Sequence, residues 1–212
     1  MIALAAAALL LFSAAATPQK LEPTGPVTDK AVPEAVRSSL EPEGVRVALS
    51  GEPWCDLWLR KGIPDEKDRT PGALHGQLAV STAVGVIRFL APATDFRGQA
   101  IRPGFYTLRY ALAPADASHL GVSEYSDFLL VVPAAEDPNP DTRFKFDDLM
   151  DASRKATGTR HPGVLSLTRP SGTSFPAVTT NDLGHVVLQV KGRLRSGAEA
   201  PIALVVKGHT EQ

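Results

Sequence analysis

Several short segments of the chain alternate apolar and polar side chains with a period of two residues. In GFYTLRYAL, residues 104–112, every second side chain from Tyr106 onward is a tyrosine or leucine, whereas Thr107 and Arg109 lie on the opposite face. The segment HVVLQVKGRL, residues 185–194, alternates in the same way. This period is that of a β-strand with one buried face. The chain is therefore predicted to build its core from β-sheet.

Other segments add to this pattern, and one departs from it. DFLLVV, residues 127–132, is apolar on both faces, as expected of a central strand. Further strand candidates are residues 45–49, 53–60, 84–90, 163–168 and 201–206. FKFDDLMDASRKATG instead has helical period, with acidic residues early and basic residues late, which suits the helix dipole. We therefore predict an all-β fold, an immunoglobulin-like or Greek-key β-sandwich, with one substantial helix inserted near residues 145–157.

The first sixteen residues have the pattern of a signal peptide. Residues 2–12 are apolar or small, and three alanines at 14–16 fit the small-residue rule for cleavage. This apolar run is shorter than the roughly 20 residues that span a bilayer. Residues 17–32 are rich in proline, threonine and lysine and are predicted to be a flexible lead-in, followed by a single β-sandwich domain over 33–212. The expected location is periplasmic or secreted.

Charge and cysteine content narrow the classes of partner. Lysine plus arginine number 22 against 23 for aspartate plus glutamate, and no basic stripe is present, which argues against nucleic acid. No later segment is apolar enough to predict a transmembrane span in the mature chain. Cys55, between two tryptophans, is the only cysteine and is interpreted as a small buried hydrophobe. The expected partner is a protein or small-molecule ligand of the cell envelope.

The run DFRGQAIRPGFYTLRYALAP, with DFLLVVPAAED and SRKATGTRHPGVLSL further along, resembles a family of exported bacterial proteins of unknown function. The likeness covers residues 45–209. It implies an exported β-sandwich and supplies no activity. Within it, the segment PGFYTL, residues 103–108, is similar to the turn and strand of many secreted β-sandwich modules, including transthyretin-like domains.

The connection 113–124 and its edge hold the candidate binding residues. Asp116 and His119 are three residues apart, and Tyr125 follows them. A carboxylate and an imidazole could share a Zn or Cu ion, and His161 could approach them in space. Such sites need three or four ligands, so the alternative is a turn at Asp116 with a histidine bound to loop backbone, and no cofactor is expected.

A second loop was interpreted as structural. Asp95 and Arg97 flank Phe96, and a carboxylate–guanidinium pair between them could brace the loop, with Arg102 or Arg109 as competing partners for the acid.

Catalytic motifs are not evident in the chain. It has no GxSxG elbow, GxGxxG fingerprint or P-loop. The first hypothesis is therefore an exported, non-catalytic β-sandwich that acts as a binding or structural module for an unknown ligand. Its binding surface is expected at the end of the sandwich that carries the loops 113–124 and 134–143. The alternatives are a periplasmic metal-binding protein using Asp116 and His119 with His161, and a hydrolase of unknown type.

Overall fold

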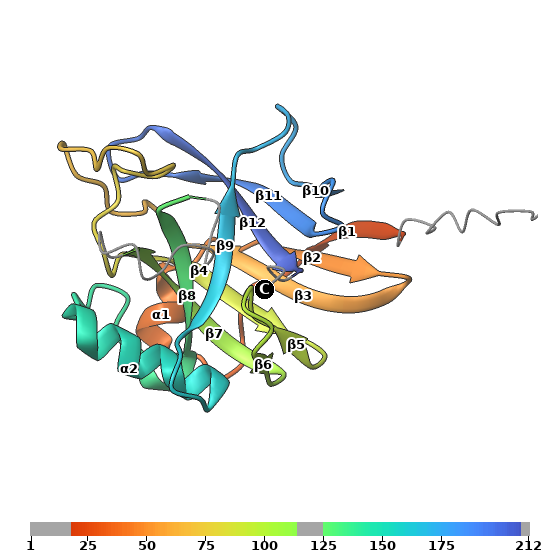
Figure 1. The fold of residues 1–212 in the computed structure, drawn as a ribbon, viewed down its shortest axis with the longest axis horizontal. Coiled ribbons are helices and arrows are strands. Elements are labelled where there is room, and N and C mark those ends of the chain that lie inside the picture. Colours follow the sequence, from red (N-terminus) through yellow and green to blue (C-terminus); the bar gives the residue numbers. More distant parts are fainter. Residues whose placement is uncertain (1–17, 114–124, 209–212) are drawn as a thin grey trace, which may run out of the picture.

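The computed structural model describes residues 18–113 and 125–208, which form one large antiparallel sheet with helices at one side (Figure 1). Ten strands pair in the order β1-β2-β3-β4-β7-β8-β9-β12-β11-β10, and β5 pairs with β6 in a small separate ribbon. In chain order the strands are β1 (Gln19–Thr24), β2 (Gly44–Leu49), β3 (Glu52–Leu59), β4 (Ala83–Phe89), β5 (Ala93–Thr94), β6 (Ala100–Ile101), β7 (Gly104–Leu112), β8 (Asp127–Pro133), β9 (Gly163–Thr168), β10 (Ala177–Thr180), β11 (Val186–Arg193) and β12 (Glu199–Lys207).

The large sheet curls until its two edge strands approach one another, which makes it nearly a barrel (Figure 1). β1 pairs in register with β2, and β10 pairs with β11. Where the edges meet, the Gln19 side-chain amide donates a hydrogen bond to the Thr180 hydroxyl. β9 lies beside β12, and β12, β11 and β10 are consecutive hairpins, which is the Greek-key order. The all-β prediction is confirmed.

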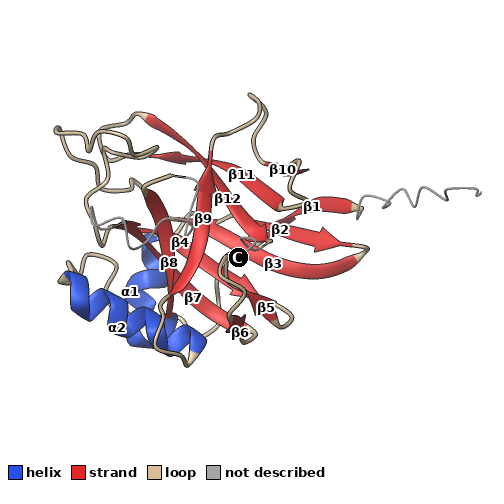
Figure 2. Cartoon of the chain, in the orientation of Figure 1, coloured by secondary structure: helices blue, strands red, loops and turns tan. Residues whose placement is uncertain are grey.

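The main core fills the inside of the curled sheet, and the helices cover its outer side (Figure 2). The helix α2 (Phe146–Thr157) packs Leu149 and Met150 against β8, and Ser153 donates a hydrogen bond of 2.9 Å from Oγ to the Val131 carbonyl. It ends at Gly158, whose φ of 67° is left-handed. The predicted substantial helix is therefore confirmed.

Two shorter helical pieces complete the outer layer. The helix α1 (Glu34–Ser39) packs Val36 against Trp58 and Val86. A short 3₁₀ helix, η2 (Ala134–Glu136), follows β8. No helix within residues 18–113 and 125–208 combines the length and apolar character that a membrane crossing requires.

The structure differs from the sequence prediction at the amino-terminal segment. Residues 19–24, assigned above to a flexible lead-in, form β1 and pair with β2 from Gln19↔Leu49 to Thr24↔Gly44. Proline is tolerated there because Pro23 lies on an edge strand, where an N–H directed away from the partner strand is not needed. The strand was missed because its sequence, QKLEPT, has no apolar alternation. β1 is ordered by its backbone pairing with β2, although the side chains of β1 do not indicate a strand.

Candidate functional site

A cavity lies at the opening between the two ends of the curled sheet. It has a volume of about 480 Å³ and is lined from β1, β2 and β3 on one side and from β11 and the segment before β10 on the other. Pro23, Val45 and Leu57 occupy one row across β1, β2 and β3, since each is the register partner of the next. We call this cavity, lined by Leu21, Glu22, Pro23, Glu41, Glu43, Gly44, Val45, Leu57, Leu59, Phe175, Pro176, Val190 and Lys191, the seam pocket.

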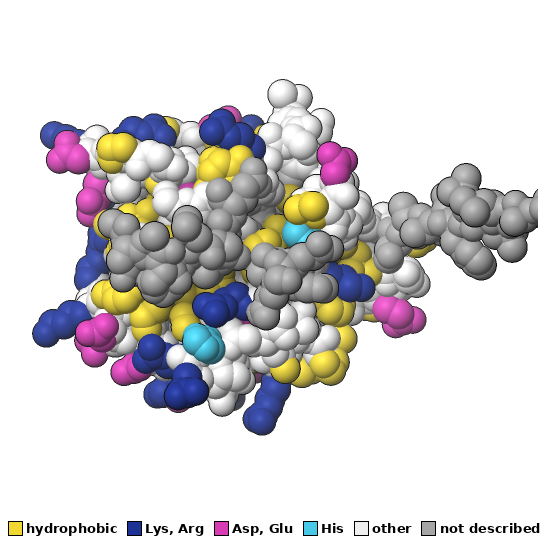
Figure 3. Space-filling model, in the orientation of Figure 1, with side chains coloured by type: hydrophobic (Ala, Val, Ile, Leu, Met, Phe, Trp, Pro, Cys, Tyr) yellow, Lys and Arg dark blue, Asp and Glu magenta, His cyan; other side chains and the backbone are white. Residues whose placement is uncertain are grey.

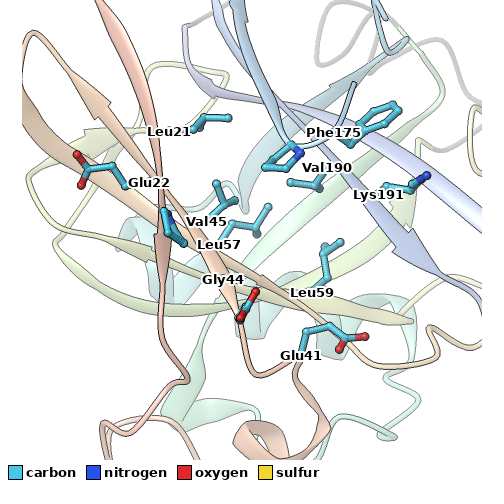
Figure 4. Close-up of a pocket in the computed structure, with 13 residues that line it drawn as sticks. Leu21, Glu22, Glu41, Gly44, Val45, Leu57, Leu59, Phe175, Val190 and Lys191 are labelled. Carbon is cyan, nitrogen blue, oxygen red and sulfur yellow. The ribbon is translucent and has the colours of Figure 1, made fainter. Parts of the chain in front are cut away.

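The seam pocket exists because β10 is shorter than the strand it covers. The β10–β11 ladder ends at the pair Ala177↔Gln189, so Val190 and Lys191 continue without a partner from β10. The chain leaves the ladder through Phe175 and Pro176, which form one wall. Figure 4 shows Val190 pointing across the opening toward Leu21, Leu57 and the other apolar side chains of β1–β3. An interior surface that a closed barrel would bury is thus open to a ligand.

The charged side chains of the seam pocket stand at its margin. Lys191 forms an ion pair of 3.0 Å with Glu199, and Glu22 forms one of 2.8 Å with Lys20. The hydrogen bond from Lys20 lowers the pKa of the Glu22 carboxyl. Figure 4 shows Glu22 directed away from the apolar side chains. Glu41 and Glu43 are exposed, and neither takes part in an ion pair within residues 18–113 and 125–208. The pocket therefore offers an apolar surface with unpaired carboxylates at one margin.

Two of the predicted binding residues, Tyr125 and His161, do not line the seam pocket. Asp116 and His119 lie outside the described residues. Tyr125 contacts Arg169, which donates a hydrogen bond of 3.2 Å from Nε to the tyrosine hydroxyl and lies 5.5 Å from the ring centre. His161 is exposed and lines a separate cavity of about 160 Å³ with Arg97 and Arg160.

The metal-binding alternative therefore stays a prediction. Within the described ranges, no group of three or more histidine, cysteine, aspartate and glutamate side chains could hold a metal ion. The test of this alternative is elemental analysis of untagged protein, in which bound Zn or Cu should disappear with His119→Ala.

The segment 134–143, predicted to help form a binding surface, is fastened to the sheet. The fully buried Arg109 of β7 donates to both carboxylate oxygens of buried Asp137, at 2.7 and 2.5 Å. The same guanidinium donates to the carbonyls of Asn139 and Thr142, each at 2.9 Å. Arg60, which directly follows β3, also forms an ion pair with Asp141 of this segment. The hydrogen bond from Arg60 lowers the pKa of the Asp141 carboxyl. These contacts give the segment a structural role.

Cys55 lies on β3 inside the sheet and is fully buried. Burial among apolar side chains raises the pKa of its thiol, because the thiolate loses its hydration. We expect the native protein to react with a thiol reagent only as fast as it unfolds, and the denatured protein to react at once. The measurement is the rate of colour release from Ellman's reagent with and without guanidinium chloride. Fast reaction of the native protein would contradict this burial.

The sequence patterns predicted that some residues of the seam pocket are buried in strands. They did not predict that a cavity opens between the two ends of the sheet. Val45, Leu57 and Val190 belong to segments whose apolar pattern predicts strands. Leu21 and Phe175 lie in segments that were not predicted to be ordered structure. The available signal was the alternation alone, which identifies a buried face and does not say what covers it.

Comparison with known proteins adds no relative to this description. No family model, no curated protein and no solved structure matches the chain. The resemblance to exported proteins of unknown function therefore stays a prediction.

Proposed function

We propose that this protein is an exported, non-catalytic binding module that takes a small, predominantly apolar molecule into the seam pocket. The observation that carries the proposal is the cavity of about 480 Å³ lined by side chains of the sheet interior. This volume falls within the roughly 300–1,000 Å³ typical of small-molecule sites, which are concave and mostly apolar with few polar groups. The apolar body of the ligand lies against Leu21, Val45 and Leu57, and a neutral or cationic end lies near the unpaired carboxylates.

The scaffold supports this role because most of the lining residues come from paired strands. Val45 and Leu57 are cross-strand partners in β2 and β3, and Val190 lies in β11, which pairs with β12. Residues held by ladders on a sheet keep their positions better than residues on free loops. The pocket is thus largely formed before the ligand binds, which reduces the ordering cost of binding.

The test uses a neutral fluorescent probe, N-phenyl-1-naphthylamine, whose emission rises in apolar surroundings. The full chain should bind it saturably at one site. Leu21→Trp should weaken binding by roughly tenfold or more, because an indole placed on β1 occupies space the probe needs. Titration of the probe by fluorescence gives the dissociation constant.

The matched control is Leu183→Trp, which makes the same replacement at a leucine that is 76% exposed and does not line the seam pocket. It should leave probe binding unchanged. Equal weakening by both variants, or no weakening by Leu21→Trp, would contradict the proposed pocket.

The exported location belongs to the same proposal and is supported by the alanine-rich first sixteen residues. Mass spectrometry of protein from its native host tests it, since retention of those residues contradicts cleavage.

A further inference from the structure

The cavity that His161 lines combines basic side chains with an apolar floor. Its volume is about 160 Å³, and its floor is made by Phe128 of β8, Phe146 and Met150 of α2, Val164 of β9 and Ala113. Its remaining lining residues are Arg97, Arg154, Arg160, His161 and Pro162. We call this cavity the arginine pocket. Figure 3 shows lysine and arginine side chains gathered around a histidine on the part of this face that lies over the C-terminal end of α2.

The arginine pocket has an excess of positive charge. None of the described residues that line it is an aspartate or glutamate. Arg154 is partly neutralised, because it forms an ion pair with Asp151 on the same helix. Arg97 and Arg160, in contrast, form no ion pair with the described part of the chain. Their guanidinium groups therefore remain able to bind an anion through paired N–H donors.

The turn that carries Arg97 is held rigidly, and by a different contact from the one predicted. Asp95 does not pair with the Arg97 guanidinium. Its buried carboxylate instead accepts hydrogen bonds from the backbone N–H groups of Arg97 and Gln99, at 2.9 and 2.8 Å, and from that of Val164 at 3.1 Å. The Arg97 side chain is thereby left to line the pocket. The predicted ion pair is wrong because backbone donors take the lone pairs of the carboxylate.

The turn that carries Arg160 and His161 is fixed to the same structure. The Thr157 hydroxyl donates to the His161 carbonyl at 2.8 Å, and Arg154 donates from Nε to the Arg160 carbonyl at 2.9 Å. The side-chain amide of Gln99 donates from Nε2 to the Pro162 carbonyl at 3.0 Å. This hydrogen bond joins the Arg160 turn to the Arg97 turn. Both basic turns are thus held relative to one another, as a specific ligand site requires.

The apolar floor remains partly open to solvent. Phe146 is 43% exposed, although it is a large apolar side chain on the helix face beside Met150. An aromatic ring left half in water next to unpaired guanidinium groups suits a ligand that has both an apolar body and an anionic group. The cavity is smaller than the usual range for drug-sized ligands, so it fits a small one.

We infer that the arginine pocket is a second binding site, which takes a small carboxylate with an aromatic or branched aliphatic body. The carboxylate binds Arg97 and Arg160, and the apolar body lies on Phe146, Met150 and Phe128. This site is separate from the seam pocket, and no lining residue is common to the two.

The test is calorimetric titration of the full chain with 2-naphthoate and with 2-naphthamide, which has the same ring system without the charge. Naphthoate should bind saturably and about tenfold more tightly than the amide, because only the anion engages the guanidinium groups. Arg97→Gln and Arg160→Gln should each weaken naphthoate binding by about fivefold to tenfold and leave the amide unaffected. Equal affinity for the acid and the amide would overturn the inference.

Two controls separate this site from general charge and from the seam pocket. Arg102→Gln removes the same charge from an exposed position outside the pocket and should leave naphthoate binding unchanged. Leu21→Trp should also leave it unchanged, because that residue lines only the seam pocket. Loss of naphthoate binding in Leu21→Trp would place the ligand in the seam pocket and refute the second site. A decrease in Arg102→Gln equal to that in Arg97→Gln would do the same, by showing a non-specific charge effect.

Discussion

Replacing Arg109 with methionine should lower the free energy of unfolding by about 3–5 kcal/mol, since breaking a buried ion pair leaves one charge without compensation. Arg109 and Asp137 are both fully buried, and the guanidinium also binds the carbonyls of Ser81, Asn139 and Thr142. The variant therefore leaves the buried Asp137 carboxylate without its counter-charge, although the Thr107 hydroxyl still donates to it at 2.6 Å, and it removes a donor from each of the three carbonyls. Denaturant unfolding followed by tryptophan fluorescence measures the change.

A double variant separates the cost of the orphaned charge from that of lost packing. Arg109→Met with Asp137→Leu removes both charges and should recover part of the lost stability, because no buried carboxylate remains unpaired. Arg102→Met, at an exposed position, should change stability by no more than about 0.5 kcal/mol. A single Arg109→Met variant as stable as the Arg102→Met control would show that the ion pair does not fasten segment 134–143 to the sheet.

Asp95→Ala should cause the second large loss of stability, roughly 3 kcal/mol, because it removes the shared acceptor of one buried and three part-buried hydrogen bonds. The carboxylate accepts from the backbone N–H groups of Arg97, Gln99 and Val164 and from the Gln99 side chain. It joins the β5–β6 turn to the start of β9, so its loss should loosen that turn as well as the fold. Thermal and denaturant unfolding measure the stability change.

The same substitution at an exposed aspartate provides the control. Asp182→Ala lies in the turn between β10 and β11 and should change stability by no more than about 0.5 kcal/mol. Asp95→Asn keeps one acceptor oxygen and should fall between the wild type and Asp95→Ala. An asparagine variant as unstable as the alanine variant would mean that the charge, and not the number of accepted bonds, governs this site.

Local patterns predicted the central strands and the helix correctly, because burial of one face leaves a periodic trace in the sequence. The segments at 104–112 and 127–132 became β7 and β8, and residues 146–157 became α2. The same reasoning missed β1 and β10, which lie at the sheet edges and carry half-buried or exposed side chains. An edge strand is ordered by backbone hydrogen bonds to the neighbouring strand. The apolar pattern of the edge strand's own sequence does not reveal this pairing.

The sequence by itself determined that this chain forms β-structure around an apolar interior. A two-residue period places the apolar side chains on one face of each strand, and that face is buried. The tertiary structure alone decided that the sheet curls and stops short of closing, so that Leu21 of β1 faces Val190 of β11 across a cavity. It also decided that Asp95 accepts hydrogen bonds from backbone N–H groups, while Arg97 and Arg160 line the same cavity. Both outcomes depend on contacts between residues that are far apart in the sequence. A local pattern of apolar and polar residues does not show which distant segments will contact each other.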